Sequence, residues 1–362
     1  MIVESVPNFS EGRRADVIEA IADAAGKAHL LDTDPDPDHN RVVVSIAGQS
    51  SRVADALVAA IAAAVERIDL RAHAGVHPRV GAADVVPVIP LGGTTLAEAR
   101  SLAHEVGRRV WTELHVPVYF YGHGENRTLA DIRAGRASLS LGDAPHPTAG
   151  AVCVGARRAL VAFNVILYDA DLVGARALAR SIRESSAGLR GVQALAFELP
   201  GNRVQLSMNL FRVDETRPGD VIAELGRRGV AMGAQQVVGL CPAAAADPSA
   251  DGRLLEGRLA AAAASAAAAL CDERGSEEHT ALARRLRRES AELAGLAADQ
   301  DAMLAGAERA AALVPVLAAA RVVDEELSAM LDAAARGFRA ALAAGTVGIY
   351  EARIAALDAR LA

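Results

Sequence analysis

Apolar and polar positions along residues 1–242 alternate in the manner of short strands and amphipathic helices. Apolar residues spaced three and four apart predict helices, and short apolar runs between turn formers predict strands. The first half is predicted to contain strands at 2–6, 28–31, 41–46, 84–89 and 116–121, and helices at 15–27, 51–67, 95–110 and 129–134. The acidic segment 32–38, where carboxylates alternate with prolines, is expected to be a loop.

The same order of elements recurs in the second half. Strands are predicted at 159–167, 192–197, 204–210 and 236–240, with helices at 172–185 and 218–228. The sequence therefore predicts an α+β fold class with two tandem βαββαβ-type α/β sandwich subdomains and a groove between their sheets. Residues 141–150, rich in Gly and Pro, are expected to line that groove.

The pattern changes after Pro242. A linker is expected over 243–252, and everything from residue 253 to 362 is expected to be helical. One stretch has a clear amphipathic rhythm, formed by Leu327, Met330, Leu331, Ala334, Phe338 and Leu342. This part is predicted to be an all-α bundle. The predicted domains are an N-terminal subdomain at 1–150, a second subdomain at 151–245 and a bundle at 253–362.

Composition narrows the class of protein. Hydrophobic residues make up 52% of the 362 residues, which suffices for sizeable cores, and the net charge of −7 argues against nucleic acid as a partner. The three cysteines are far apart and form no CxxC pair, which is typical of a reducing compartment. Neither a signal peptide nor an apolar run of about 18 residues is evident. We expect a cytoplasmic protein, without membrane partners, that forms a homodimer or a higher homo-oligomer.

The stretch from His73 to Asp84 is the candidate centre of chemistry. A metal site at His73 and His77 is disfavoured, because Gly75 and Pro78 interrupt the helix that an HxxxH pair requires. An imidazole titrates near neutrality, so His77 is a candidate general base.

The other groups of this stretch, and two tyrosines, have more than one interpretation. The guanidinium of Arg79 could bind a carboxylate or form a structural ion pair. Either histidine could also be a loop residue that bonds to the backbone. Tyr119 and Tyr121 could stack on a flat ligand or pack in the core, with equal merit.

Six motifs in order give the chain a resemblance to a known family. They are Val6–Arg13, Leu31–Asp34 with Asn40-Arg41, His73–Pro87, Pro117–Gly122, Gly155–Arg157 with Ala162–Asn164, and Gln205–Leu210. Together they resemble the glutamate formimidoyltransferases. That family has two α/β subdomains with a folate tunnel between them, and it transfers the formimino group of N-formimino-L-glutamate to tetrahydrofolate in histidine degradation.

The resemblance implies roles for particular residues. His77 corresponds to the catalytic histidine, and Asp34 to the acidic residue of the Leu-Asp-x-Asp motif, which could orient His77 or the folate ring. The folate-contacting segment falls on 141–150. The residues predicted to bind substrate or folate are Arg79, Arg41, Asn40, His73, Tyr121, Gly142 and Gly150. Tetrahydrofolate is implied as the co-substrate, without a metal.

The helical tail is similar to a cyclodeaminase domain, whose catalytic aspartate would fall on Asp301. Leu255–Arg258 replace the glycine-rich loop of that domain, so a structural or oligomerising tail is favoured. Two alternatives stay open, namely a bifunctional enzyme and a folate-binding scaffold protein without turnover. The donor is either formimino-glutamate or formyl-glutamate.

Overall fold

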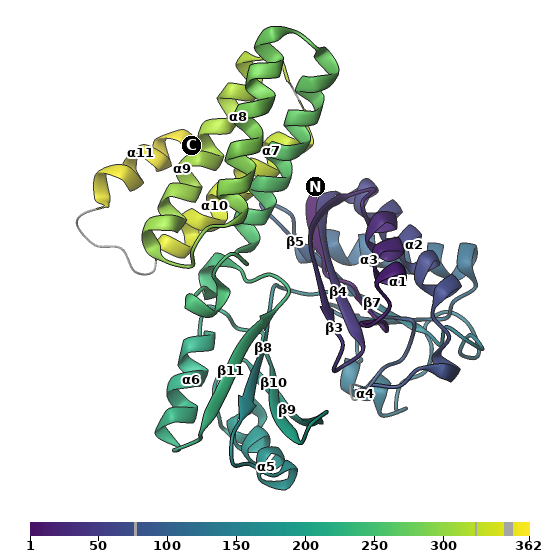
Figure 1. The fold of residues 1–362 in the computed structure, drawn as a ribbon. Coiled ribbons are helices and arrows are strands. Elements are labelled where there is room, and N and C mark those ends of the chain that lie inside the picture. The colour runs from purple at the N-terminus through teal and green to yellow at the C-terminus, as the bar shows by residue number, and fades with distance from the viewer. Residues whose placement is uncertain (76–77, 323, 344–349) are drawn as a thin grey trace. The chain divides into compact units, whose positions relative to one another are not determined.

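The computed structural model describes residues 1–75, 78–322, 324–343 and 350–362 (Figure 1). Contacts divide the chain into two compact units. The first unit comprises residues 1–158 and 197–203, and the second comprises 159–196 and 204–362. Two sheets with helices, followed by helices alone, confirm the predicted α+β fold class. The predicted domain boundaries stay predictions.

A seven-stranded sheet forms the first unit, with the order β1-β4-β2-β5-β7-β6 and with β3 paired to β4. Its strands are β1 (Ile2–Ser5), β2 (Asn8–Phe9), β3 (His29–Asp36), β4 (Arg41–Gln49), β5 (Ala83–Pro90), β6 (Val118–Gly122) and β7 (Val152–Ala156). Its helices are α1 (Ala15–Ala25), α2 (Ser50–Arg67), α3 (Leu96–Leu114) and α4 (Leu129–Arg133), with a 3-10 turn at Leu70–Ala72.

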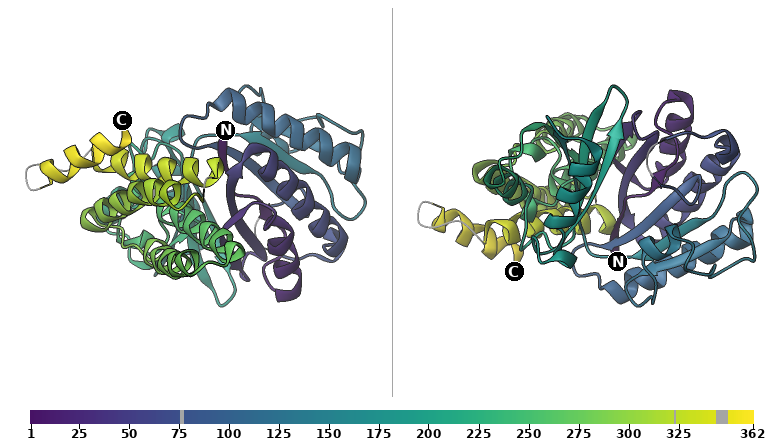
Figure 2. Two further views of the ribbon diagram at one scale, coloured as in Figure 1. Left: turned by 90° about the horizontal axis from the view of Figure 1, so that it is seen from above. Right: turned by 90° about the horizontal axis from the view of Figure 1, so that it is seen from below.

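Helices α1, α2 and α3 pack on one face of this sheet, as Figures 1 and 2 show. Alternate strand residues such as Val42, Val44 and Ile46 point into that core and are fully buried, because successive side chains of a strand point to opposite faces. The other face has a small apolar cluster of its own, formed by Val85, Tyr121 and Cys153 with Ile132 of α4. We call this second face the α4 face.

The prediction of a loop over residues 32–38 was wrong for most of its length. Strand β3 extends to Asp36 and pairs with β4 alone, with Asp34 opposite Val43 and Asp36 opposite Arg41. Pro35 is tolerated because a proline can occupy an edge strand, where its missing N–H leaves no ladder bond unmade.

Strand β7 was missing from the predicted elements. It is fully buried and lies parallel between β5 and β6. Its sequence, Val152–Ala156, shows no period-two alternation, but it is a short apolar run after Gly150, which is a pattern of a fully buried strand that the prediction overlooked. Both neighbours are distant in sequence, and this pairing completes the α4 face.

The second unit begins with a four-stranded sheet in the order β11-β8-β10-β9. Its elements are β8 (Val161–Leu167), α5 (Leu172–Ile182), β9 (Val192–Leu199), β10 (Arg203–Leu210), α6 (Pro218–Arg227) and β11 (Met232–Val238). This is the predicted βαββαβ order. Short 3-10 turns at Glu184–Ser186, Ala243–Ala245 and Pro248–Ala250 connect these elements and lead to the helices.

Helices form the remainder of the second unit. They are α7 (Leu255–Arg274), α8 (Glu277–Ala294), α9 (Gln300–Ala319), α10 (Glu325–Leu342) and α11 (Glu351–Leu361). The predicted apolar stripe of α10 is buried throughout, from Leu327 to Leu342. Within the described residues, α9 is the one helix with the length and apolar composition to cross a membrane. The buried share of its 18-residue apolar window is 44%, and the helix packs against α10.

Glu256 lies in the first turn of α7 and is 9% exposed. Its Oε2 accepts a hydrogen bond of 2.8 Å from the N–H of Ala243, and its side chain packs where Gly337 of α10 leaves room. Burial raises the pKa of this carboxyl group to about 7, although the N–H of Ala243 opposes the rise. Glu256 is therefore a largely desolvated acid between the last strand and the bundle.

We predict that Glu256→Gln stabilises the protein at pH 8. The folded pKa lies above the unfolded value, so the wild type loses stability as pH rises from about 4.5 to about 7. Glutamine keeps the acceptor for Ala243 without this loss, and the gain should approach about 3 kcal/mol above pH 7 and vanish near pH 4. Urea unfolding at several pH values measures it. Glu273→Gln, at an exposed position of α7, should show no such pH dependence.

Candidate active site

Asp84 occupies an irregular point of β5 and is 6% exposed. The pairing of β5 with β2 shifts register here, with Val85 opposite Asn8 but Ala83 opposite Phe9. Such a shift leaves one residue outside the regular alternation. The Asp84 carboxylate accepts from the N–H of Val80 at 2.5 Å and from Arg133 of α4 at 2.9 Å. It thereby links the segment that follows the His73 loop to α4.

Arg41 begins β4 on the α4 face and is partly buried, with its Nε atom enclosed. Burial lowers the pKa of its guanidinium, and the carboxylates of Asp36 and Asp84 oppose that change. Arginine stays charged despite such a shift. The nearby positive charge of Arg133 lowers the pKa of Arg41 further. Two guanidinium groups therefore lie close to one another beside Asp84.

Asp36 is bonded to the turn between β3 and β4. Its Oδ1 accepts from the N–H of His39 at 2.9 Å, and its Oδ2 lies 2.6 Å from His39 Nδ1. Burial alone would raise the pKa of Asp36, but these bonds with His39 hold it below its ordinary value. Asp36 is thus an ionised acceptor within the turn.

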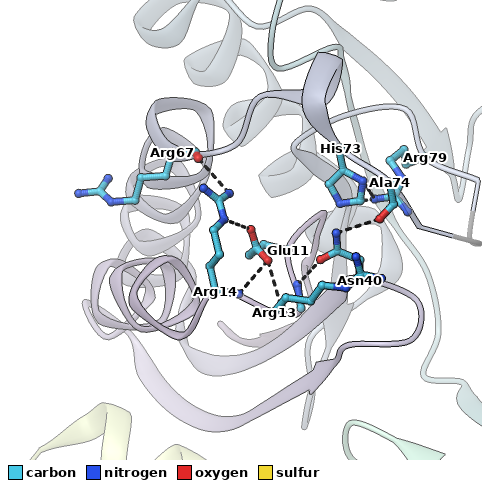
Figure 3. A network of polar contacts seen from close by, with 9 residues as sticks. Glu11, Arg13, Arg14, Asn40, Arg67, His73, Ala74 and Arg79 are labelled. Carbon is cyan, nitrogen blue, oxygen red and sulfur yellow. Dashed lines mark hydrogen bonds and ion pairs between the residues drawn. The ribbon is translucent and has the colours of Figure 1, made fainter.

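Asn40 connects two of the motifs (Figure 3). Its Oδ1 accepts from the N–H of Gly12 at 2.9 Å, and its Nδ2 donates to the carbonyl of Ala74 at 3.0 Å. The backbone of Asn40 has a φ of 50°, in the left-handed region that asparagine tolerates better than most residues. A Cβ at Gly12 would lie 2.5 Å from the N atom of Arg41, so only glycine permits this approach. Asn40 therefore fixes the loop that contains His73.

His73 and Arg79 contact each other, with Arg79 Nη1 2.6 Å from His73 Nδ1. Arg79 Nη2 also donates to the carbonyl of His39 at 3.4 Å. Burial lowers the pKa of His73, and the positive charge of Arg79 lowers it further. His73 is therefore a neutral imidazole at neutral pH, held against a guanidinium (Figure 3).

Glu11 orders the start of α1 beside this loop (Figure 3). Its Oε1 accepts from the backbone N–H groups of Arg13 and Arg14 at 2.9 and 3.0 Å. Arg14 in turn donates to the carbonyl of Arg67 at 3.1 Å. The first motif thus acts mainly through local backbone contacts that hold the loop before α1.

Tyr121 belongs to the apolar cluster of the α4 face and is 5% exposed. Its ring therefore packs in the core, which was one of the two interpretations of the tyrosines, and Tyr119 packs beside it, partly buried. A Cβ at Gly155 would lie 1.9 Å from the carbonyl oxygen of Tyr121, so β7 can approach β6 only because that residue is glycine. Burial raises the pKa of the Tyr121 phenol to about 12, and Arg157 opposes part of the rise. The hydroxyl group is thus a donor.

Gly142 and Gly150 bound the predicted folate segment. Both have a φ in the left-handed region, 88° and 68°. A Cβ at Gly150 would lie 2.3 Å from the carbonyl oxygen of Val80, and one at Gly142 would lie 2.9 Å from the Trp111 ring. These glycines are required by the backbone of the segment. Their contact with folate stays a prediction.

The structure brings together most of the predicted site residues of the first unit. Asp34 lies on the same face of β3 as Asp36, two residues away. His77 lies outside the described residues. Asp301 belongs to the second unit and is exposed at the start of α9, where its Oδ1 accepts from the hydroxyl of Tyr350 at 2.5 Å. In the described ranges, no group of three His, Cys, Asp or Glu could hold a metal ion.

Arg133, which bonds Asp84, is not among the predicted site residues. It ends a helix of five residues that begins with a capping box, in which Thr128 and Asp131 bond reciprocally. The capping pattern predicted the helix but gave no indication of which sheet face it packs against. Ile132, buried next to Arg133, was the available signal, because an apolar residue in so short a helix indicates docking on a core.

Comparisons with known proteins identify relatives of this chain. Residues 2–157 match the family model described as the formiminotransferase domain, N-terminal subdomain. The chain is similar to a glutamate formimidoyltransferase of Thermoplasma acidophilum, with 39% identity over 67% of this chain and 88% of that protein. The corresponding enzyme of Streptococcus pyogenes is 34% identical over 67% of this chain and 90% of its own length. A formimidoyltransferase-cyclodeaminase of Rattus norvegicus is 35% identical, and this chain covers 50% of it.

We predict that Arg79→Gln raises the pKa of His73 toward its ordinary value. The substitution removes the positive charge but leaves the burial, so the rise should be partial. In the wild type, the folded state disfavours protonation of His73. The protein therefore loses stability as pH falls below 6.5, where the unfolded chain takes up the proton first. NMR titration of the histidine Cε1 signals, with His73→Gln for assignment, measures the pKa. Arg71→Gln, which removes an exposed partner of Asp69, should leave His73 unchanged.

Proposed function

This chain belongs to the formiminotransferase family, and we propose on that basis that it transfers the formimino group from N-formimino-L-glutamate to tetrahydrofolate. The products are 5-formiminotetrahydrofolate and glutamate. The observation that carries the proposal is the 39% identity to the Thermoplasma acidophilum enzyme over 88% of that protein's length. The charged residues on the α4 face support it, because both substrates bear carboxylates.

The reaction requires one bond to carbon to form and another to break. The N5 amine of tetrahydrofolate attacks the formimino carbon, and a base removes the N5 proton. The tetrahedral intermediate then collapses, the bond to the glutamate nitrogen breaks, and that nitrogen receives a proton. Aligning two bound substrates could contribute roughly 7–11 kcal/mol of the barrier, and a general base contributes about 10²–10⁴-fold.

We assign the proton transfer to His77. Asp34 is proposed to orient His77 or the folate ring, and Arg79 or Arg41 to bind a substrate carboxylate. His73 and Asn40 support these groups: the first contacts Arg79 at 2.6 Å, and the second holds the backbone at Ala74. A neutral His73 beside Arg79 does not neutralise the guanidinium charge.

The proposal involves small-molecule substrates and no metal. The donor set of the described residues is rich in arginine and poor in clustered metal ligands, which fits carboxylate recognition. We further propose a cytoplasmic location, an oligomer of identical chains, and no nucleic-acid or membrane partner. A folate-binding scaffold without turnover is the alternative that the activity assay excludes or supports.

We predict that His77→Ala lowers kcat by about 10²–10⁴-fold while the protein still binds tetrahydrofolate. The measurement is a spectrophotometric assay with formimino-glutamate and tetrahydrofolate, and formyl-glutamate tests the other donor. His123→Ala, at an exposed histidine, should retain wild-type turnover. Wild-type turnover by His77→Ala would contradict the assignment, and binding without turnover by the unmodified protein would indicate the scaffold.

The helical tail is proposed to be structural, and the test is release of ammonia in the same assay. The hydrogen bond between Tyr350 and Asp301 joins α11 to the start of α9, which is a packing role. We therefore predict no enzymatic release of ammonia from 5-formiminotetrahydrofolate, and no change in transfer by Asp301→Asn. Ammonia release that Asp301→Asn abolishes would instead establish the bifunctional alternative, as the name of the Rattus norvegicus relative suggests.

A further inference from the structure

Several buried donor atoms of the first unit have no hydrogen-bond partner among the described residues, and three of them lie around Arg133 on the α4 face. These three are Arg41 Nε of β4, Arg133 Nε of α4 and the hydroxyl of Tyr121 of β6. Buried donors are nearly always bonded, because an unmade bond costs roughly 1–3 kcal/mol. Arg157 lies beside the Tyr121 hydroxyl, but a guanidinium can only donate, so the hydroxyl proton still lacks an acceptor. A bound acceptor, water or ligand, is needed to satisfy these donors.

These atoms belong to one neighbourhood. The positive charge of Arg133 lowers the pKa values of Arg41, of Tyr121 and of the buried Cys153 of β7. All three side chains therefore lie near Arg133. Arg133 Nη2 donates to Asp84 Oδ2 at 2.9 Å, while the other oxygen of Asp84 accepts from Val80. Asp84 thus fixes the direction of the Arg133 side chain and occupies only part of its donor fork.

The carboxylates that act on Arg41 most strongly already have other partners. Asp36 is bonded to His39, and Asp84 accepts from Val80 and Arg133. The unpaired polar atoms around Arg133 are therefore donors, and a buried donor without an acceptor is costly. A carboxylate fits, because a guanidinium fork and a phenol hydroxyl donate to its two oxygens.

We propose that Arg133, together with the Tyr121 hydroxyl and Arg41, binds a carboxylate of the amino-acid donor, and that Asp84 is the positioning residue of Arg133. This assignment rests on the proposed transferase function for the identity of the amino acid. It makes Arg133 a determinant of specificity for a donor that bears a carboxylate over one that bears an amide.

The test is binding of glutamate, the product, to the full chain by isothermal titration calorimetry. Arg133→Gln should weaken binding about 10- to 100-fold, which corresponds to one lost charge-assisted interaction. Arg133→Lys should restore part of the affinity, and Tyr121→Phe, which keeps the ring, should weaken binding about 3- to 10-fold. Arg136→Gln is the matched control, because Arg136 follows the same helix but pairs with Asp131 at the surface.

Kinetics separate this role from a structural one. Arg133→Gln should raise KM for formimino-glutamate and leave KM for tetrahydrofolate unchanged, whereas general damage would change both. Unchanged glutamate affinity in Arg133→Gln and Tyr121→Phe overturns the inference, as does wild-type protein that binds no glutamate. If Arg133→Gln does not fold, Tyr121→Phe and Arg133→Lys decide. Glutamate binding that depends on Arg133, without formimino transfer, supports the site and refutes the transferase.

Discussion

The buried carboxylate of Asp84 is the interaction on which the α4 face depends. It lies where β5 departs from regular register, and it bonds the backbone at Val80 on one side and Arg133 on the other. A buried carboxylate is stable only when charged or polar partners surround it. The loop that follows His73, the strand β5 and the helix α4 are therefore coupled through one side chain, and a change at any of them reaches the others.

The two units obtain their stability differently. The first unit has a large apolar core between α1–α3 and the sheet, so its second face is available for charged residues. The second unit combines a small sheet with five long helices rich in alanine, and it buries an acid, Glu256, between them. Small alanine side chains allow close helix approach, and Gly337 allows the still closer approach that accommodates Glu256.

The sequence predicted those elements whose apolar residues repeat with the period of a helix or a strand. The stripe of α10 and the βαββαβ order of the second sheet are of this kind. Strand β7 and the extension of β3 to Asp36 show no such periodicity. Pairing with β5 and β6, distant in sequence, decides β7, and pairing with β4 within one hairpin decides the extension of β3. The site divides similarly. His73, Asn40 and Arg41 lie in motifs, whereas Arg133 lies outside them and is placed by the docking of Ile132 on the sheet and by its bond to Asp84.

The bonds of Asn40 also have a consequence for local opening. They join Gly12 after β2 to Ala74 before β5, two segments with no sequence proximity, through one amide in a left-handed turn. The backbone at Ala74 is therefore held only while the turn between β3 and β4 and the loop after β2 are both in place. An opening of that turn releases the backbone beside His73, whereas the apolar core under α1–α3 does not depend on the Asn40 amide.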